Sequence, residues 1–309
     1  MTHPPHSHSG YRLSPAMALF LLLTINLAWG SSYAVAKYAL IVIPASTLAF
    51  IRFFVGGFFL MLIPSPRHGK LSSKDWKDIF LIGSFGLAIS NALLNLGLQM
   101  TSSTKTAIAA SLEPIFTIIL AAWLLKEVLQ RRTIHATVVS ISGAFILMLG
   151  QKSIAQLAAE LAASGEFMGD LLVILSILTT ALYSVLMKPV AQKLGAIRAT
   201  AYGFFMGSAL LSPIVYLELS QLWPLNFTKE SLLAIIFLGV ICNAVGYALW
   251  NVILKYTDAG VMSVTLYAQP VGGVLTGWLW LGESLTVVGV FGAILIFIGM
   301  WLLPGEPAD

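Results

Sequence analysis

Residues 231–256 read SLLAIIFLGVICNAVGYALWNVILKY, and they include no charged side chain before Lys255. An α-helix rises about 1.5 Å per residue, so about 20 apolar residues cross a hydrocarbon core roughly 30 Å thick. The bilayer core offers no water to backbone N–H and C=O groups, so a spanning segment satisfies them within a helix. This stretch therefore predicts a transmembrane helix.

Apolar blocks of similar length recur along the whole chain. Of its 309 residues, 58% are hydrophobic and 10% are charged, whereas soluble domains carry roughly 25% charged residues. We expect an all-α integral membrane protein. Its ten transmembrane helices are expected at Pro15–Tyr38, Pro44–Ile63, Trp76–Met100, Thr104–Leu125, Thr133–Gly150, Asp170–Val190, Ala199–Leu219, Ser231–Tyr256, Gly260–Leu281 and Leu285–Leu303.

The composition also excludes several classes of function. The net charge is +4, but the basic residues lie between the apolar blocks, so we expect no nucleic-acid partner. A single cysteine, Cys242, excludes an intrachain disulfide. We find no Gly-rich Walker loop, so ATP hydrolysis by this chain is not expected. No cofactor and no metal site are expected, because His3, His6 and His8 lie in a tail that we expect to be disordered.

The basic residues predict which way the helices point. Of the 17 Lys and Arg residues, 12 fall at the amino terminus or in the loops on its side, and 4 on the opposite side, with Arg52 inside a span. Cytoplasmic loops carry the excess of Lys and Arg. Both termini of this multi-pass protein are therefore expected in the cytoplasm.

The second half of the chain repeats the first at a fixed offset of 156 residues. Some identical residues at this offset are not explained by the apolar composition. They are Gly83 and Gly239, Asn95 and Asn251, Pro114 and Pro270, Glu127 and Glu283, and Gly143 and Gly299. Tyr33 and Tyr183 align more weakly, at an offset of 150. Five spans in each copy insert the second copy upside down, which is the inverted-repeat plan of many secondary transporters. The expected organisation is a tail (1–14), a first repeat (15–150), a loop (151–169), a second repeat (170–303) and a tail (304–309).

Four short motifs make this layout resemble the drug/metabolite transporter superfamily, and within it the EamA-type bacterial exporters. They are Trp29-Gly30-Ser31-Ser32, Arg52-Phe53, Pro114 with Glu127, and Pro270 with Gly282-Glu283. The first copy departs from the Gly-Glu pattern, because Lys126 precedes Glu127. The resemblance implies a protein of the bacterial inner membrane that exports amino acids or related metabolites. It does not identify the substrate.

Two ionisable residues lie deep inside expected spans. Arg52 and Glu113 are each about 12–15 Å from the outer face by helical rise. A charge at that depth is paired or lines a wet cavity. Arg52 is a candidate for binding a substrate carboxylate and Glu113 for taking up protons; the alternative is a structural ion pair between them. Pro114 and Pro270 are candidate kinks or gates at equivalent places in the two halves.

Polar and aromatic side chains supply the other candidates for substrate binding. The amides and phenols are Asn91, Asn95, Asn243, Tyr247, Asn251, Tyr267 and Gln269, and the aromatic walls are Trp29, Tyr33 and Tyr183, with Trp250 beside them. Such groups either line a polar centre or bond neighbouring helices and anchor the membrane interface.

The leading hypothesis is a secondary transporter that exports amino acids or similar small metabolites. Nucleotide sugars, nucleosides and lipid-linked sugars are alternative cargo on the same scaffold, although Arg52 is the only firm buried cation for their phosphates. A membrane enzyme would need clustered acids or histidines, and His135 stands alone in its span. The expected partners are a small-molecule substrate and the lipid bilayer. Proton coupling and passive exchange are both open, as are monomer and homodimer.

Overall fold

In a computed structural model of the chain, the structure describes residues 14–64, 71–101, 106, 109–151, 155–156, 159, 167–222, 225, 227–281 and 286–303. Within these ranges the chain is helical apart from short turns, and no strand occurs. Residues 1–13 of the expected amino-terminal tail, with its histidines, the expected tail 304–309, most of the loop 151–169, and Gly282-Glu283 lie outside the described residues.

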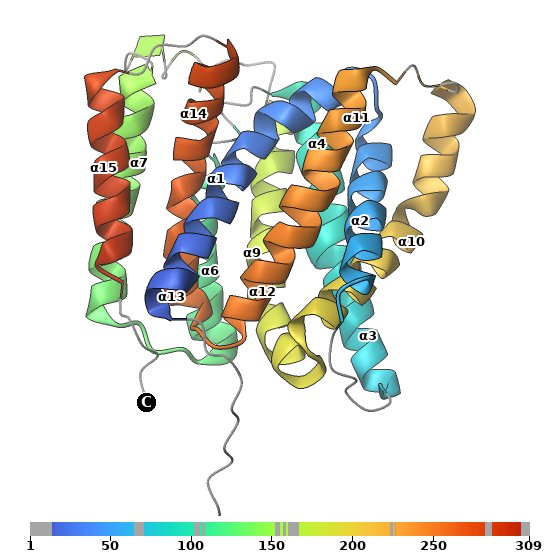
Figure 1. Cartoon of the computed structure of the whole chain (residues 1–309), viewed down its shortest axis with the longest axis horizontal. Coiled ribbons are helices and arrows are strands. Elements are labelled where there is room, and N and C mark those ends of the chain that lie inside the picture. The colour runs from blue at the N-terminus through green and yellow to red at the C-terminus, as the bar shows by residue number, and fades with distance from the viewer. Residues whose placement is uncertain are drawn as a thin grey trace, which may run out of the picture.

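The helices of the first half run up and down the bundle in alternating directions (Figure 1). They are α1 (Pro15–Ala39), α2 (Ala45–Met61), the continuous α3 (Ser73–Leu81), η1 (Ile82–Ile89) and α4 (Ser90–Met100), then α6 (Glu113–Leu120) with η2 (Ala121–Leu125), and α7 (Arg131–Gln151).

The second half has a similar series of helices. They are α9 (Phe167–Leu194), α10 (Ala196–Leu222), the continuous α11 (Lys229–Ile236), η3 (Phe237–Tyr247) and α12 (Ala248–Leu254), then α13 (Ala259–Ser263), η4 (Val264–Ala268) and α14 (Gln269–Leu281), and α15 (Val287–Trp301). The chain enters α1 and leaves α15 at the same end of the bundle, which we call the terminal end (Figure 1).

Local sequence explains where several helices begin. Ser72 caps α3 in a reciprocal box with Asp75, and Thr228 caps α11 in the same way with Ser231. Such boxes satisfy backbone N–H groups that a helix start leaves without a partner. In both halves the third long helix widens into a π-helix, η1 in one and η3 in the other. π-Helical turns are rare in proteins, and those that occur often lie at functional sites.

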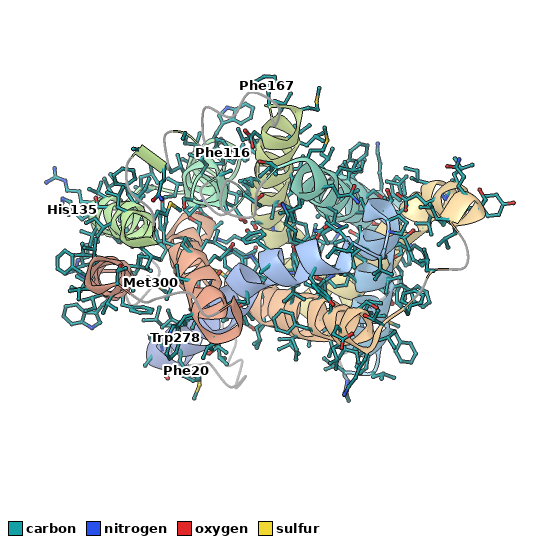
Figure 2. The ribbon with its side chains drawn as sticks, turned by 90° about the horizontal axis from the view of Figure 1, so that it is seen from above. Phe20, Phe116, His135, Phe167, Trp278 and Met300 are labelled. Atoms are coloured by element: carbon teal, nitrogen blue, oxygen red, sulfur yellow. The ribbon has the colours of Figure 1, made fainter. Side chains whose placement is uncertain are left out.

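Six described helical stretches are long and apolar enough to cross a membrane. They are Pro15–Ala39, Ser73–Met100, Arg131–Gly150, Phe167–Leu194, Ala196–Leu222 and Lys229–Leu254. Three shorter apolar stretches, at Ala45–Met61, Glu113–Leu125 and Val287–Trp301, accompany them. Large apolar side chains such as Phe20, Phe167 and Trp278 are exposed and point away from the bundle (Figure 2). An apolar periphery of this kind suits contact with lipid rather than water.

The helices are arranged around α1 and α9. Helices α7 and α15 pack on each other at one edge of the bundle, and α10 lies at the opposite edge (Figures 1 and 2). Helix α1 crosses the middle and contacts η3, η4 and α14. This crossing is so close that a Cβ atom added to Gly30 would lie 1.8 Å from the Gln269 carbonyl oxygen. Both halves of the chain therefore meet at the centre of the molecule.

Candidate functional site

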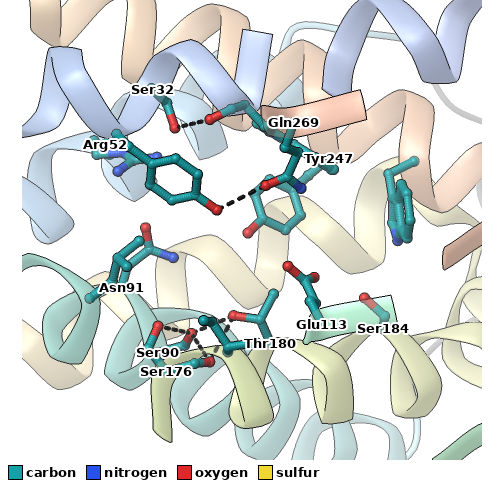
Figure 3. Close-up of a pocket in the computed structure, with 15 residues that line it drawn as sticks. Ser32, Arg52, Ser90, Asn91, Glu113, Ser176, Thr180, Ser184, Tyr247 and Gln269 are labelled. Carbon is teal, nitrogen blue, oxygen red and sulfur yellow. Dashed lines mark hydrogen bonds between the residues drawn. The ribbon is translucent and has the colours of Figure 1, made fainter. Parts of the chain in front are cut away.

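A pocket lies where α1, α2, α4, α6, α9, η3, α12 and α14 converge (Figure 3). Its lining residues are Trp29, Ser32, Tyr33, Arg52, Ser90, Asn91, Leu94, Glu113, Ser176, Ile177, Thr180, Ser184, Tyr247, Trp250 and Gln269. The centres of water molecules can occupy about 70 Å³ of it, which is room for several waters. This volume is below the roughly 300–1,000 Å³ of typical ligand pockets.

Residues 156 positions apart in the sequence line this pocket together. Asn91 pairs in this way with Tyr247, Leu94 with Trp250, and Glu113 with Gln269. The two halves therefore contribute equivalent positions of equivalent helices to one space.

Arg52 lies on one wall of the pocket and is 5% exposed. Its Nη2 donates a hydrogen bond to Asn243 Oδ1 at 3.2 Å, and its Nε has no partner among the described residues. The alternative, a structural ion pair between Arg52 and Glu113, does not form among the described residues. Equal depth in the bundle was not sufficient, because α2 packs on α10 and η3 rather than on α6.

Glu113 begins α6 and faces the pocket from a different wall, where it is 7% exposed. No hydrogen bond or ion pair to its carboxyl group is found within the described part of the chain. A buried carboxyl group without a fixed partner is costly unless water, a proton or a ligand satisfies it. Arg52 and Glu113 thus face one small space without contacting each other.

Gln269 opens α14 and meets Tyr33 across the pocket. The Tyr33 hydroxyl donates to Gln269 Oε1 at 2.8 Å. Pro270 follows Gln269 just as Pro114 follows Glu113, and each proline stands at the second position of an α-helix. Neither proline lines the pocket. Both lie where the helix path is interrupted, by a turn before α6 and by the 3₁₀ segment η4 before α14.

An aromatic wall closes one side of the pocket. The Trp29 ring lies 5.2 Å from Tyr247 and 5.5 Å from Trp250, measured between ring centroids. Trp29 Nε1 donates to the Cys242 carbonyl oxygen in η3 at 2.9 Å. Tyr183 lies behind this wall, 5.7 Å from Tyr247 in an edge-to-face arrangement. Edge-to-face and tilted pairs of this kind are favourable and hold the rings in place.

Five of the candidate residues do not line the pocket. Asn95 donates to the Ala45 carbonyl oxygen at 3.0 Å. Asn251, its equivalent in the second half, donates to Tyr183 Oη at 2.6 Å and Thr200 Oγ1 at 2.8 Å. Both amides therefore bond neighbouring helices. The other three are Tyr183, Asn243, which supports Arg52, and Tyr267, which is buried among apolar side chains of α7, α14 and α15.

A cluster of hydroxyl groups lines the pocket and was not singled out from the sequence. Ser90 Oγ donates to the Ser176 carbonyl oxygen at 2.9 Å and lies 2.6 Å from Thr180 Oγ1. Ser176, Thr180 and Ser184 recur every four residues on α9, which places them on one face of a helix. That spacing was the signal in the sequence that could have found them. Among the described residues no group of three or more His, Cys, Asp or Glu side chains is placed to hold a metal ion.

Comparison with known proteins identifies the family of this chain. The model of the EamA-like transporter family matches residues 16–149 and 167–304. An uncharacterized transporter of Archaeoglobus fulgidus is 29% identical over 290 residues, which cover 92% of this chain and 97% of that protein. The uncharacterized transporter YoaV of Bacillus subtilis is 24% identical over 286 residues, covering 91% of this chain and 94% of YoaV.

Two further similarities extend over nearly the whole chain. A protein of Streptantibioticus cattleyicolor named "Probable terminal-alkyne amino-acid exporter" is 21% identical over 289 residues, covering 93% of each chain. A protein of known crystal structure superimposes with a TM-score of 0.70 at 18% sequence identity, covering 92% of this chain and 96% of its own. The latter likeness concerns the fold alone.

Proposed function

Because the chain belongs to the EamA-like transporter family, we propose that it is a secondary transporter that exports amino acids or related small metabolites through the central pocket. One observation carries the proposal: the pairs Asn91 and Tyr247, and Glu113 and Gln269, lie 156 residues apart and line the same space. A site built from equivalent positions of two similar halves is what alternating access requires.

We infer ten membrane-spanning segments in two inverted repeats. In their described parts the expected spans overlap helices or continuous helical series, except that a turn at 111–112 interrupts the fourth. The bonds of the equivalent amides support the inversion. Asn95 ties α4 to the start of α2, whereas Asn251 ties α12 to the start of α10 at the terminal end (Figure 1). Two halves related by inversion place equivalent contacts at opposite ends of the bundle.

The charges of the pocket favour a substrate that carries both a positive and a negative group. A guanidinium binds a carboxylate through charge-assisted hydrogen bonds, and Arg52 offers a buried one whose Nε is unpaired among the described residues. Glu113 supplies a negative charge, and the faces of Trp29 and Tyr247 attract a cation. An amino acid has a carboxylate and an ammonium group of this kind.

The direction of transport and the cellular location rest on similarity and on charge. The similarity to the protein named "Probable terminal-alkyne amino-acid exporter" favours export of an amino acid. The distribution of Lys and Arg favours termini in the cytoplasm of a bacterial inner membrane. Nucleotide sugars are disfavoured because, among the residues that line the pocket, Arg52 is the single Lys or Arg available for a diphosphate.

Counterflow in liposomes tests the proposal. Purified protein is reconstituted into liposomes that are loaded with an unlabelled amino acid. Labelled amino acids and other metabolites are then supplied outside, one at a time. We expect uptake of one or more amino acids above the rate of empty liposomes, and a loss of about tenfold or more with Arg52→Ala. Lys229→Ala, at an exposed position, is the control and keeps the rate. Uptake that no solute raises above empty liposomes overturns the function.

The same liposomes separate the two modes of coupling. If Glu113 carries protons in exchange for substrate, an acidic liposome interior accelerates uptake by the wild type and leaves uptake by Glu113→Gln unaffected. If exchange is passive, the gradient changes neither protein. Glu230→Gln makes the same chemical change at an exposed position and serves as the control.

A further inference from the structure

Three charged side chains from distant parts of the sequence meet at the terminal end of the bundle. Lys188 Nζ on α9 lies 2.6 Å from Glu127 Oε1 and 3.1 Å from Asp258 Oδ1. Glu127 follows η2, and Asp258 directly precedes α13. Lys188 and Glu127 are largely buried, so water screens their attraction less than it would on an open surface. The cluster thus connects α6–η2, α9 and α13.

The Glu127 carboxylate has a second set of partners. Its Oε1 accepts a hydrogen bond from the Ala259 N–H at 3.1 Å, and its Oε2 accepts one from the Gly260 N–H at 3.1 Å. These N–H groups open α13 and have no partner within that helix. Glu127 therefore caps α13. One carboxylate therefore holds the first half of the chain to the second.

The turn that carries Glu127 is strained. Lys126 has a φ of 56°, the single positive φ among the described residues other than glycine. A side chain in this left-handed region costs about 1 kcal/mol or more relative to glycine. Such strain persists where the surrounding contacts hold it, and here it turns Glu127 toward α13 and Lys188.

An apolar layer separates this cluster from the pocket. Its buried members come from both halves and are Leu22, Ile25, Ala121, Val185, Trp250, Ile253, Leu254, Ala259, Met262 and Leu266, with Trp29 packed against them. Trp29 and Trp250 also line the pocket. Along α9 the order is Ser184 in the pocket, Val185 in the layer and Lys188 in the charged cluster. The pocket is therefore covered on its terminal side first by apolar side chains and then by the ion pairs.

We propose that Lys188, Glu127 and Asp258 form a latch that holds the terminal end of the pocket closed, and that these three side chains separate when the pocket opens to that side. This inference rests on the proposed transport function. For an exporter with cytoplasmic termini, the latch opens to admit substrate and closes before release. These ion pairs form in one state and are broken in the other, and only a contact that differs between two conformations shifts the equilibrium between them.

A matched ion pair on the same helix supplies the control. Lys193, one turn beyond Lys188 on α9, binds Asp75 of α3 at the same end of the bundle. Lys193 is 62% exposed, and neither Lys193 nor Asp75 belongs to the apolar layer. Lys188→Met removes the latch and Lys193→Met removes the control pair, each by replacing an ammonium with a thioether of similar length.

Accessibility of a pocket cysteine measures the opening directly. Ser184→Cys is introduced together with Cys242→Ala, and the protein in liposomes reacts with a membrane-impermeant maleimide supplied on the terminal side or on the opposite side. We expect Lys188→Met to raise the labelling rate from the terminal side about tenfold, and Lys193→Met to leave it unchanged. Asp258→Asn, which keeps the Lys188–Glu127 pair, raises it less and replaces Lys188→Met if that variant does not fold. Equal rates in the latch and control variants overturn the proposal.

The labelling rate tests the latch and the counterflow rate tests the transport function, so either proposal can be refuted without the other. Counterflow that persists while Lys188→Met leaves labelling unchanged removes the latch and keeps the transporter. Faster labelling in Lys188→Met with no solute moved by the wild type keeps the latch and removes the proposed function.

Discussion

Glu113 and Gln269 occupy equivalent positions in the two halves of the chain, each directly before a proline, and both line the central pocket. One is a carboxyl group and the other its neutral amide counterpart. The two halves are therefore similar in backbone but differ in an ionisable side chain at the central pocket. A substrate with a positive group has one orientation in the pocket that places this group at Glu113.

The first prediction concerns this difference in charge. Glu113→Gln makes the two positions chemically alike, so an amino-acid substrate loses its partner for the ammonium group. We expect KM to rise about tenfold or more, since a hydrogen bond to a charged group contributes about 1.5–3 kcal/mol. Initial counterflow rates over a range of substrate concentrations measure the change. A KM equal to that of the wild type contradicts a role for Glu113 in binding the ammonium group.

The second prediction separates amides that line the pocket from amides that join helices. Asn251→Ala removes hydrogen bonds to Tyr183 and Thr200, so we expect a lower thermal midpoint, equivalent to about 1 kcal/mol, and an unchanged KM. Asn91→Ala changes the pocket wall instead, so KM rises while the midpoint stays the same. Unfolding followed by tryptophan fluorescence, together with counterflow, distinguishes the two. A raised KM in Asn251→Ala would return that residue to the binding site.

The third prediction tests the strain at Lys126. Lys126→Gly gives the first copy the residue that the second copy has at position 282, and glycine adopts a φ of 56° without steric penalty. We expect the thermal midpoint to rise by about 2 °C, because relief of roughly 1 kcal/mol shifts a protein of this size by that amount. Lys126→Ala keeps the Cβ atom and is the control, with no rise. Equal midpoints for the two variants would show that the strain is absent.

The fourth prediction concerns the crossing of α1 with α14. A Cβ atom at Gly30 would lie 1.8 Å from the Gln269 carbonyl oxygen, whereas one at Gly273 would lie 3.8 Å from the Gly30 carbonyl oxygen. We therefore expect Gly30→Ala to destabilise the fold by about 3 kcal/mol and Gly273→Ala to be tolerated. Yield of monodisperse protein and its thermal midpoint measure both. A stable Gly30→Ala variant would mean that the two helices can move apart at little cost.

Positions that the two halves share could be read from the sequence. The helical series followed from hydropathy, and the fixed offset brought out Asn95 with Asn251 and Pro114 with Pro270. The same offset relates Glu113 to Gln269, and both face the pocket. Depth along a helix and membership of a repeat are one-dimensional properties, and sequence determines them directly.

The sequence did not predict which helix faces which. Arg52 and Glu113 lie at similar depth, yet Arg52 bonds Asn243, because the face that α2 turns inward is decided by its packing on α10 and η3. Asn91 and Asn95 share one helical face, yet the first lines the pocket and the second bonds Ala45. A difference of this kind depends on the local crossing of two helices, and no periodicity within one helix encodes it.

The paired π-helices have a consequence for the history of the protein. Each π turn holds more residues than an α turn, and η1 and η3 fall in the same register of the two halves. Two separate insertions at one register would be needed if each half had acquired its wide turn alone. A single acquisition suffices if the ancestral five-helix unit already had it. On that account the widened helix is older than the duplication that produced the two halves.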